Sequence, residues 1–287
     1  MITSRMVVST DYFFMEMMMR VNTVLLLIMT ACLSGCASPD AAHYRVPEPA
    51  EADKVSVILA QGLSTSEQQQ GERISQISAA FLGTPYEANT LIGSPDTSEA
   101  LVINFKGVDC FTLLDYVQAL SRSHDRASFK ANLIRTRYVD GEVSYLKRRH
   151  FFSDWFADSP RNADDVTRTL SPDAVTVVKQ LNRQASGAEQ VPGLGVIARR
   201  ITYIPAQAIT PQVLKQIQTG DYVGVYATTQ SLDVTHVGIA VRHDGRLWFR
   251  NASSLAVNRK VVDAPFREYM RSKPGIIVLR AVPLTAP

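Results

Sequence analysis

The sequence predicts an α+β fold, in which N-terminal helices pack on a C-terminal antiparallel sheet of about five or more strands. Between residues 67 and 138 the apolar side chains recur at the three- and four-residue spacing of helix faces. From residue 202 onward short apolar runs alternate with turn residues, which is typical of strands. Helices first and an antiparallel sheet afterwards define the α+β class.

The predicted helical half contains three helices, and the middle one begins at Cys110. A short apolar run over residues 101–105, predicted to be extended and buried and closed by Gly107, leads into it. The other two helices are predicted over residues 67–82, ending at Gly83, and over 129–138, before a turn at Asp140-Gly141.

Cys110 lies at a helix start, because Asp109 before it is a good N-cap. Unsatisfied backbone N–H groups and the positive end of the helix dipole meet a sulfur there, and both favour the thiolate and lower the pKa of a cysteine. The alternative is a small hydrophobic side chain buried at a helix start. The apolar face that follows is formed by Cys110, Leu113, Leu114, Val117 and Leu120.

Residues 1–36 resemble a bacterial lipoprotein signal. The apolar run 21–31 follows Arg20, is short for a membrane span, and ends in Leu33-Ser34-Gly35-Cys36. Cleavage before Cys36 leaves this cysteine as the lipidated N-terminus, and an uncleaved anchor helix is the alternative. Because Ala37-Ser38 contains no acidic retention signal, we expect a cell-envelope protein anchored in the outer membrane and facing the periplasm.

The chain contains three cysteines. If Cys32 is removed with the signal and Cys36 carries lipid, Cys110 is the only thiol left in an oxidising compartment. Secreted proteins normally pair their cysteines, so an unpaired one indicates a reactive thiol.

The composition is that of an ordinary globular protein. The net charge is +3 and 46% of the residues are hydrophobic, with no basic cluster of the kind that binds nucleic acid. The five histidines are scattered, no metal-ligand spacing is present, and we expect neither metal nor cofactor. We predict a flexible tether over residues 37–53 and one monomeric domain over 54–287.

Residues 148–156 combine aromatic side chains with a histidine and two arginines. This patch is either the aromatic edge of the core with arginines reaching to solvent, or a recognition wall for a polar or carboxylate-bearing ligand. Residues 164–200 are polar and are predicted to be an irregular, lid-like excursion.

A reactive thiol needs a base, and His236 is the best-placed histidine because it lies within a predicted strand. Asn251 lies on the neighbouring predicted strand and can hydrogen-bond the far nitrogen of the imidazole, which fixes its tautomer. A structural role for His236 is the alternative. The predicted strands are 221–226, 234–241, 247–254, 261–263 and 275–280, with short helices over 211–218 and 265–271.

Several motifs resemble the NlpC superfamily of papain-like cysteine peptidases that act on cell walls. They are Thr84-Pro85-Tyr86, Val108-Asp109-Cys110-Phe111-Thr112, Thr235-His236-Val237-Gly238-Ile239 and Asn251-Ala252-Ser253-Ser254. Within it, Arg137-Tyr138, Asp140-Gly141, Arg149-His150-Phe151, Asp154-Trp155 and the Ala-Ser-Ser ending resemble the N-acetylmuramoyl-L-alanine amidase-like family, formerly a domain of unknown function. The resemblance covers residues 67–280 and implies the papain-like NlpC-type fold.

The resemblance implies a nucleophile at Cys110, a general base at His236 and an orienting residue at Asn251. It also implies that the Tyr86 hydroxyl, with the Cys110 N–H, stabilises the oxyanion. The substrate-binding positions expected around them are Arg149, His150, Phe151, Trp155, Asp109, Thr235 and Ser253.

The implied activity is cleavage of the N-acetylmuramoyl–L-alanine amide bond in peptidoglycan or soluble muropeptides. Two alternatives stay open: an endopeptidase that cuts the stem peptide next to D-Glu, and a non-catalytic lipoprotein that binds muropeptide.

Overall fold

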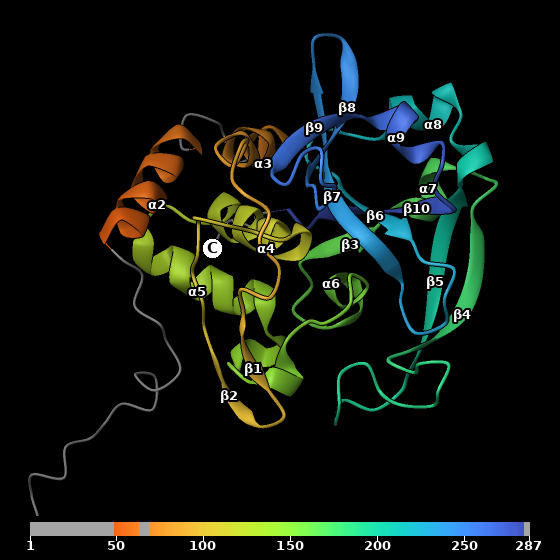
Figure 1. Ribbon diagram of the computed structural model, residues 1–287. Coiled ribbons are helices and arrows are strands. Elements are labelled where there is room, and N and C mark those ends of the chain that lie inside the picture. Colours follow the sequence, from red (N-terminus) through yellow and green to blue (C-terminus); the bar gives the residue numbers. More distant parts are fainter. Residues whose placement is uncertain (1–48, 63–68, 284–287) are drawn as a thin grey trace, which may run out of the picture. The chain divides into compact units, whose positions relative to one another are not determined.

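An antiparallel β-sheet forms the centre of the molecule in the computed structural model, which describes residues 49–62 and 69–283 (Figure 1). The strand order is β4-β5-β10-β6-β7-β8-β9, and β3 pairs with β10 as the eighth strand. The sheet and the helices around it confirm the predicted α+β class. The strands are β3 Ala163–Asp165, β4 Val175–Leu181, β5 Ile197–Pro205, β6 Tyr222–Tyr226, β7 Val234–His243, β8 Arg246–Ala252, β9 Val261–Pro265 and β10 Gly275–Ala281.

Helices cover both faces of this sheet, because successive side chains of its strands point to opposite sides. Tyr222 and Tyr226 of β6 join the core formed with the N-terminal helices, whereas Val223 and Val225 join a second core on the opposite face. The first core contains α2 Pro49–Gly62, α3 Gln70–Ala79, α4 Cys110–Ser121 and α5 Arg126–Arg137. The second core contains α7 Thr167–Leu170, α8 Pro211–Gln216 and α9 Phe266–Met270.

The helices predicted around the cysteine are present, with boundaries shifted by a few residues. The predicted helix 67–82 is α3, and the predicted helix 129–138 is α5, which begins earlier because Asp125 and Ser128 form a capping box. Residues 101–105 are buried, except for the partly exposed Asn104, but belong to no strand. A hairpin of β1 Ile92–Ser94 and β2 Thr97–Ala100 precedes them and was not predicted.

The segment 164–200 is largely regular, so the prediction of an irregular excursion was wrong. It contains α7, part of β3 and the β4–β5 pair, which runs in register from Val175 opposite Tyr203 to Leu181 opposite Ile197. The polar pattern of β4 misled the prediction, because Lys179 is buried and donates to the carbonyl oxygens of Ala227 and Thr229, both at 2.6 Å.

The predicted signal with Cys36 and most of the predicted tether lie outside the described residues. Residues 49–53, the last part of that tether, belong instead to helix α2. Within the described ranges no helix is long and apolar enough to cross a membrane.

Candidate active site

Cys110 is the first residue of α4 and is partly exposed. A capping box fixes this helix start: one carboxylate oxygen of Asp109 accepts the N–H groups of Phe111, at 3.0 Å, and Thr112, at 2.7 Å. The Thr112 hydroxyl in turn accepts the Asp109 N–H at 2.9 Å. The nucleophile candidate therefore lies at a rigid position.

Burial, reinforced by the negative charge of Asp109, raises the pKa of the Cys110 thiol to about 12. The backbone N–H groups of Val237, Cys110 and Phe111 lower this pKa, but by less. The prediction that the helix start favours the thiolate was therefore wrong. The physical reason is that desolvation of the buried sulfur outweighs the stabilisation by these N–H groups, and that the Asp109 carboxylate adds its own negative charge beside the sulfur.

His236 and Asn251 meet on the adjacent strands β7 and β8, with Nε2 of the imidazole 2.9 Å from Oδ1 of the amide. The orientation of the amide is fixed, because its Nδ2 donates to the carbonyl oxygen of Phe249 at 3.1 Å. Nε2 therefore carries the proton, and Nδ1 is left with its lone pair. Burial also lowers the pKa of His236, which keeps the imidazole neutral near pH 7.

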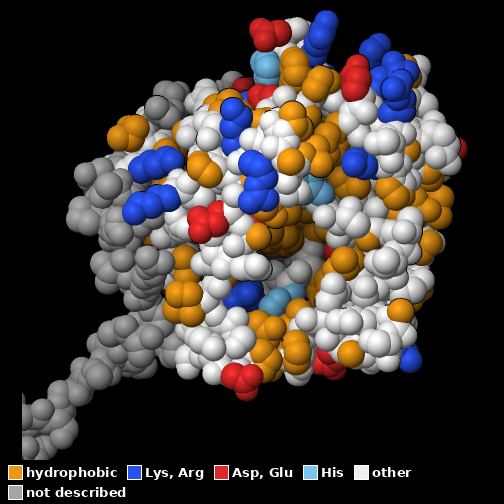
Figure 2. Space-filling view, in the orientation of Figure 1, with side chains coloured by type: hydrophobic (Ala, Val, Ile, Leu, Met, Phe, Trp, Pro, Cys, Tyr) orange, Lys and Arg blue, Asp and Glu red, His pale blue; other side chains and the backbone are white. Residues whose placement is uncertain are grey.

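The helix start and the histidine strand lie against each other. The N–H of Val237, the residue after His236, interacts with the Cys110 sulfur, and the charge of Asp109 reaches the imidazole. Figure 2 shows a hollow in one face of the molecule, with hydrophobic and histidine side chains at its border. The predicted Cys-His-Asn set is thus brought together by α4, β7 and β8.

Tyr86 lies beside the cysteine on an extended segment. Its backbone pairs in parallel with Val108, two residues before Cys110, and its N–H donates to the Arg259 carbonyl at 2.9 Å. Burial raises the pKa of the phenol, and so do the nearby charges of Cys110 and Asp109. The Arg259 guanidinium, 4.9 Å from the centre of the ring, opposes that rise. The phenol thus keeps its proton.

Tyr269 and Lys273 also belong to this site and were missed in the sequence. The Tyr269 ring lies 6.4 Å from the His236 ring. Burial raises the pKa of the Tyr269 phenol, and the negative charge of Cys110 raises it further. The Lys273 ammonium lies 4.9 Å from the centre of the Tyr269 ring. No local sequence pattern could identify them, because α9 and the turn after it come close to Cys110 and His236 only in the folded protein.

Most of the predicted aromatic wall is internal. Trp155 has no exposed surface and packs edge-on against Phe111 and Tyr222, and Phe151 is 3% exposed. Arg149 is also buried, and its guanidinium donates to the carbonyl oxygens of Asp154, Asp158 and Pro160. These three residues hold the loop around α6 Asp154–Ala157, so the core-edge alternative describes them and the prediction of a substrate wall was wrong for them.

The other predicted binding positions differ in exposure. His150 is partly exposed and contacts the Tyr145 carbonyl at 2.7 Å, and burial lowers the pKa of its imidazole to about 4. Thr235 is exposed at the start of β7, one residue before His236. Ser253 is buried, and its hydroxyl accepts from Asn258 at 3.3 Å. Thr235 and His150 therefore remain available at the surface.

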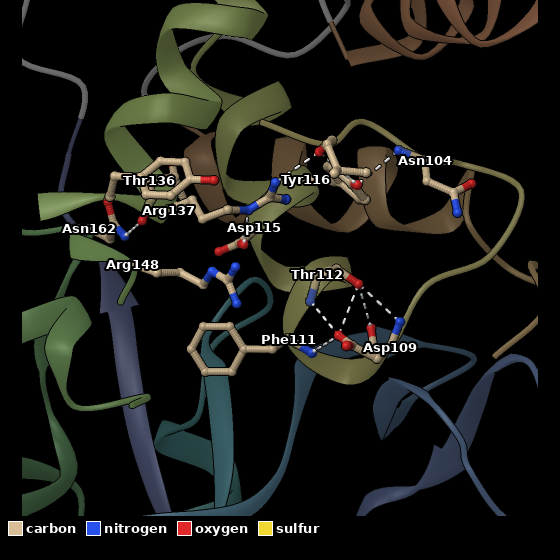
Figure 3. A network of polar contacts seen from close by, with 12 residues as sticks. Asn104, Asp109, Phe111, Thr112, Asp115, Tyr116, Thr136, Arg137, Arg148 and Asn162 are labelled. Atoms are coloured by element: carbon tan, nitrogen blue, oxygen red, sulfur yellow. Dashed lines mark hydrogen bonds and ion pairs between the residues drawn. The ribbon is translucent and has the colours of Figure 1, made fainter. Parts of the chain in front are cut away.

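A buried polar network anchors α4 behind the site (Figure 3). Arg137 of α5 points at Asp115 of α4, with its Nε 2.8 Å from the carboxylate, and also donates to the Val102 carbonyl at 2.8 Å. The Tyr116 hydroxyl accepts the Asn104 N–H at 2.9 Å. The helix that carries Cys110 is thereby fixed to α5 and to the segment before it.

The described side chains form no metal-binding site. Within the part of the chain that the structure describes, no group of three His, Cys, Asp or Glu side chains is arranged to hold an ion.

Residues 76–276 match the N-acetylmuramoyl-L-alanine amidase-like family over most of the chain. The chain belongs to this family. No curated protein matches the chain in sequence.

Two solved structures are similar to this protein over most of its chain. An N-acetylmuramoyl-L-alanine amidase from Bacteroides uniformis is 30% identical, with a TM-score of 0.61, over 74% of this chain and 99% of the other. A Legionella pneumophila protein of the family DUF1460 is 22% identical, with a TM-score of 0.69, over 81% of this chain and 94% of the other. The second likeness bears on the fold alone.

Proposed function

We propose that this protein is a cysteine-dependent amidase that hydrolyses the N-acetylmuramoyl–L-alanine amide bond of peptidoglycan or of muropeptides released from it. The observation that carries the proposal is the 2.9 Å contact between His236 and Asn251, on strands that lie against the start of the Cys110 helix. Membership in the amidase-like family and the named Bacteroides amidase support the choice of bond.

The first step joins Cys110 to the substrate. The thiol and the imidazole are both neutral at rest, so Nδ1 of His236 takes the S–H proton as the sulfur bonds to the amide carbon. The carbonyl π electrons move onto oxygen and form an oxyanion. Asn251 holds the imidazolium in place through Nε2.

The oxyanion needs hydrogen-bond donors where its charge develops. The backbone N–H of Cys110 and the phenol of Tyr86 are the donors that we assign to this role, and Tyr86 stays protonated because its pKa is raised. Collapse of the oxyanion breaks the C–N bond, and the amine leaves with the proton from His236.

Hydrolysis of the thioester completes the cycle. His236 takes a proton from water as the water oxygen attacks the thioester carbon, and the sulfur leaves as it regains that proton. The products are the muramic acid carboxylate and a free stem peptide.

The cellular setting belongs to the same proposal. We place the protein in the NlpC superfamily and in the cell envelope, as a monomer with Cys36 lipidated and the domain facing the periplasm from the outer membrane. Labelling of growing cells with a fatty-acid analogue tests the anchor: the wild type takes up label, and Cys36→Ser does not.

The activity test uses the soluble domain without residues 1–36 and muropeptides of known structure. Mass spectrometry should find the intact stem peptide and the free sugar with the wild type, and neither with Cys110→Ala or His236→Ala. Products cut within the peptide would keep the nucleophile and replace the assigned bond with the one next to D-Glu. If the wild type and both variants bind the muropeptides equally well and the wild type cleaves none of them, the protein would be a binding protein and not an enzyme.

A further inference from the structure

Lys273 holds a positive charge beside the candidate base. Its ammonium lies 4.9 Å from the centre of the Tyr269 ring, and that ring lies 6.4 Å from the ring of His236. Both rings also contact Phe249, at 4.9 Å and 5.9 Å between ring centres. An aromatic cluster therefore connects the cation to the imidazole.

The backbone holds Lys273 in place. Its N–H donates to the Met270 carbonyl at 3.0 Å, and the next carbonyl, that of Pro274, accepts from Ala206 at 3.2 Å. The end of α9 and the start of β10 are thus tied together. The backbone of Lys273 therefore needs no reordering when the side chain binds a ligand.

Lys273 makes no ion pair with a carboxylate within residues 49–62 and 69–283. Other basic groups of the domain do so: Arg250 binds Asp263 in a bidentate arrangement, and Lys147 lies 3.5 Å from Asp140. The Lys273 side chain is only partly exposed and its contact is with a ring face. Its three N–H donors therefore remain available to an anion.

The position of Lys273 indicates which part of the substrate it can contact. In the proposed reaction His236 gives its proton to the departing amine, so the departing peptide must pass on the side of the imidazole. Tyr86, the donor assigned to the oxyanion, pairs instead with Val108 next to the helix start, and the Arg259 guanidinium lies over its ring. Lys273 and Tyr269 lie beside that imidazole, and hence on the path of the peptide that leaves.

We infer that Lys273, supported by the Tyr269 ring, binds a carboxylate of the departing peptide, and that the enzyme thereby selects substrates with an acidic group next to the residue that follows the cleaved bond. The inference rests on the proposed amidase function. In a stem peptide this group is the free carboxylate of D-Glu. Lys273 is thus a specificity-determining residue.

The test measures binding with Cys110→Ala, so that no ligand is cleaved. The two probes are N-acetylmuramoyl-L-Ala-D-Glu and its carboxamide, N-acetylmuramoyl-L-Ala-D-isoglutamine, which differ only in the charge. We expect the acid to bind about 5- to 10-fold more tightly by calorimetry, the range of a hydrogen bond to a charged group in a partly exposed site.

Lys273→Met in the same background should bring the two affinities within about twofold of each other, and Lys273→Arg should keep the preference. The matched control is Lys215→Met, an exposed lysine of α8, which should also keep it. Tyr269→Phe should keep the preference and Tyr269→Ala should lose it, because the ring and not the hydroxyl supports the cation.

Two outcomes overturn the inference in different ways. Equal binding of the two probes, or an unchanged preference in Lys273→Met, would remove the role of Lys273 while cleavage by the active enzyme would leave the proposed function standing. No binding of either probe, together with no cleavage by the active enzyme, would remove the proposed function and the inference with it.

Discussion

Cys110 and His236, the nucleophile and base of the proposed mechanism, are both held neutral by their surroundings. Burial and Asp109 raise the pKa of Cys110 to about 12, and burial lowers the pKa of His236 from 6.5. A thiolate–imidazolium pair at rest would need the opposite shifts. The site therefore resembles a serine hydrolase in its proton transfer, since the base removes the proton only as the nucleophile attacks.

The pH dependence of kcat/KM should follow from these shifts. The imidazole must be neutral to act, and burial makes protonation harder, so half of the activity should be lost only at a pH below 6.5. No loss from ionisation of the thiol is expected between about pH 7 and pH 10, because the pKa of Cys110 is about 12. The groups that face His236 are Asn251, Tyr269, Lys273 and Asp109.

A profile measured with a muropeptide substrate checks this, and alkylation of Cys110 by iodoacetamide at each pH provides an independent readout. A bell-shaped profile with an alkaline limb near pH 8 to 9 would contradict it, because that limb would report an imidazolium paired with a thiolate.

Replacing Asn251 tests whether this side chain orients the His236 imidazole or only fills space in the core. Asn251→Ala leaves Nε2 of His236 without an acceptor, and we expect kcat/KM to fall about 10²-fold. Asn251→Asp keeps an acceptor and adds a negative charge, so it should retain more activity and move the acid limb to higher pH.

The control for this pair is Asn258→Ala, which removes the neighbouring asparagine that contacts Ser253. We expect it to change kcat/KM by less than about twofold. A loss in Asn258→Ala as large as that in Asn251→Ala would assign the effect to the loop after β8 and not to the imidazole.

At the scale of single elements, a buried ion pair between Asp115 and Arg137 holds α4 against α5. The Asp115 and Arg137 side chains are 3% and 1% exposed, and Arg137 also donates to the Val102 carbonyl. A buried pair of this kind adds little net stability, but breaking it leaves an uncompensated charge. Its main effect is to fix the position of the helix that starts at Cys110.

We expect Arg137→Met to lower the free energy of unfolding by about 3–5 kcal/mol, because the Asp115 carboxylate stays buried without its partner. The double variant Asp115→Leu with Arg137→Met should recover most of that loss, since neither charge remains. Urea unfolding of the wild type, both single variants and the double variant measures it. Additive losses in the double variant would show that the two side chains do not interact.

Elements with regular patterns could be predicted, and those with buried polar groups could not. The apolar spacing after Cys110 is that of a helix face, and the short apolar runs of β6 and β7 end at turn residues, so these elements could be predicted. β4 was missed because Lys179 occupies a core position, where backbone carbonyls satisfy its charge. The Arg149–Trp155 stretch was misassigned for the same reason, because three carbonyls hold the buried guanidinium.

For the site, the sequence identified groups on strong local signals and missed those that depend on packing. Cys110 and His236 carry reactive atoms, and Asn251 follows from strand pairing. Tyr269 and Lys273 are ordinary residues of a short helix and a turn, and their meaning depends on where α9 packs. No spacing in the chain reports that position.

At the scale of the whole domain, the site exists only when helices and sheet are packed together. Cys110 belongs to the helical side, whereas His236 and Asn251 belong to the sheet. The helices and the sheet contact each other through Tyr222 of β6, whose hydroxyl donates to Gln118 of α4 at 2.7 Å. Loss of this packing would separate Cys110 from His236.

Trp155 can report that separation, because the protein has two tryptophans, of which Trp155 is fully buried in the core between helices and sheet and Trp248 is only partly buried at its edge. Trp155 contacts Phe111 of α4 and Tyr222 of β6, whereas Trp248 stacks on His243 near the β7–β8 turn. In Trp248→Phe, the fluorescence of Trp155 should shift to longer wavelength at the same urea concentration at which activity is lost. Activity lost at lower urea, with Trp155 still buried, would mean that the rim of the site opens independently of the packed layers. Coincident transitions would mean that the cooperativity of the fold itself keeps Cys110 and His236 together.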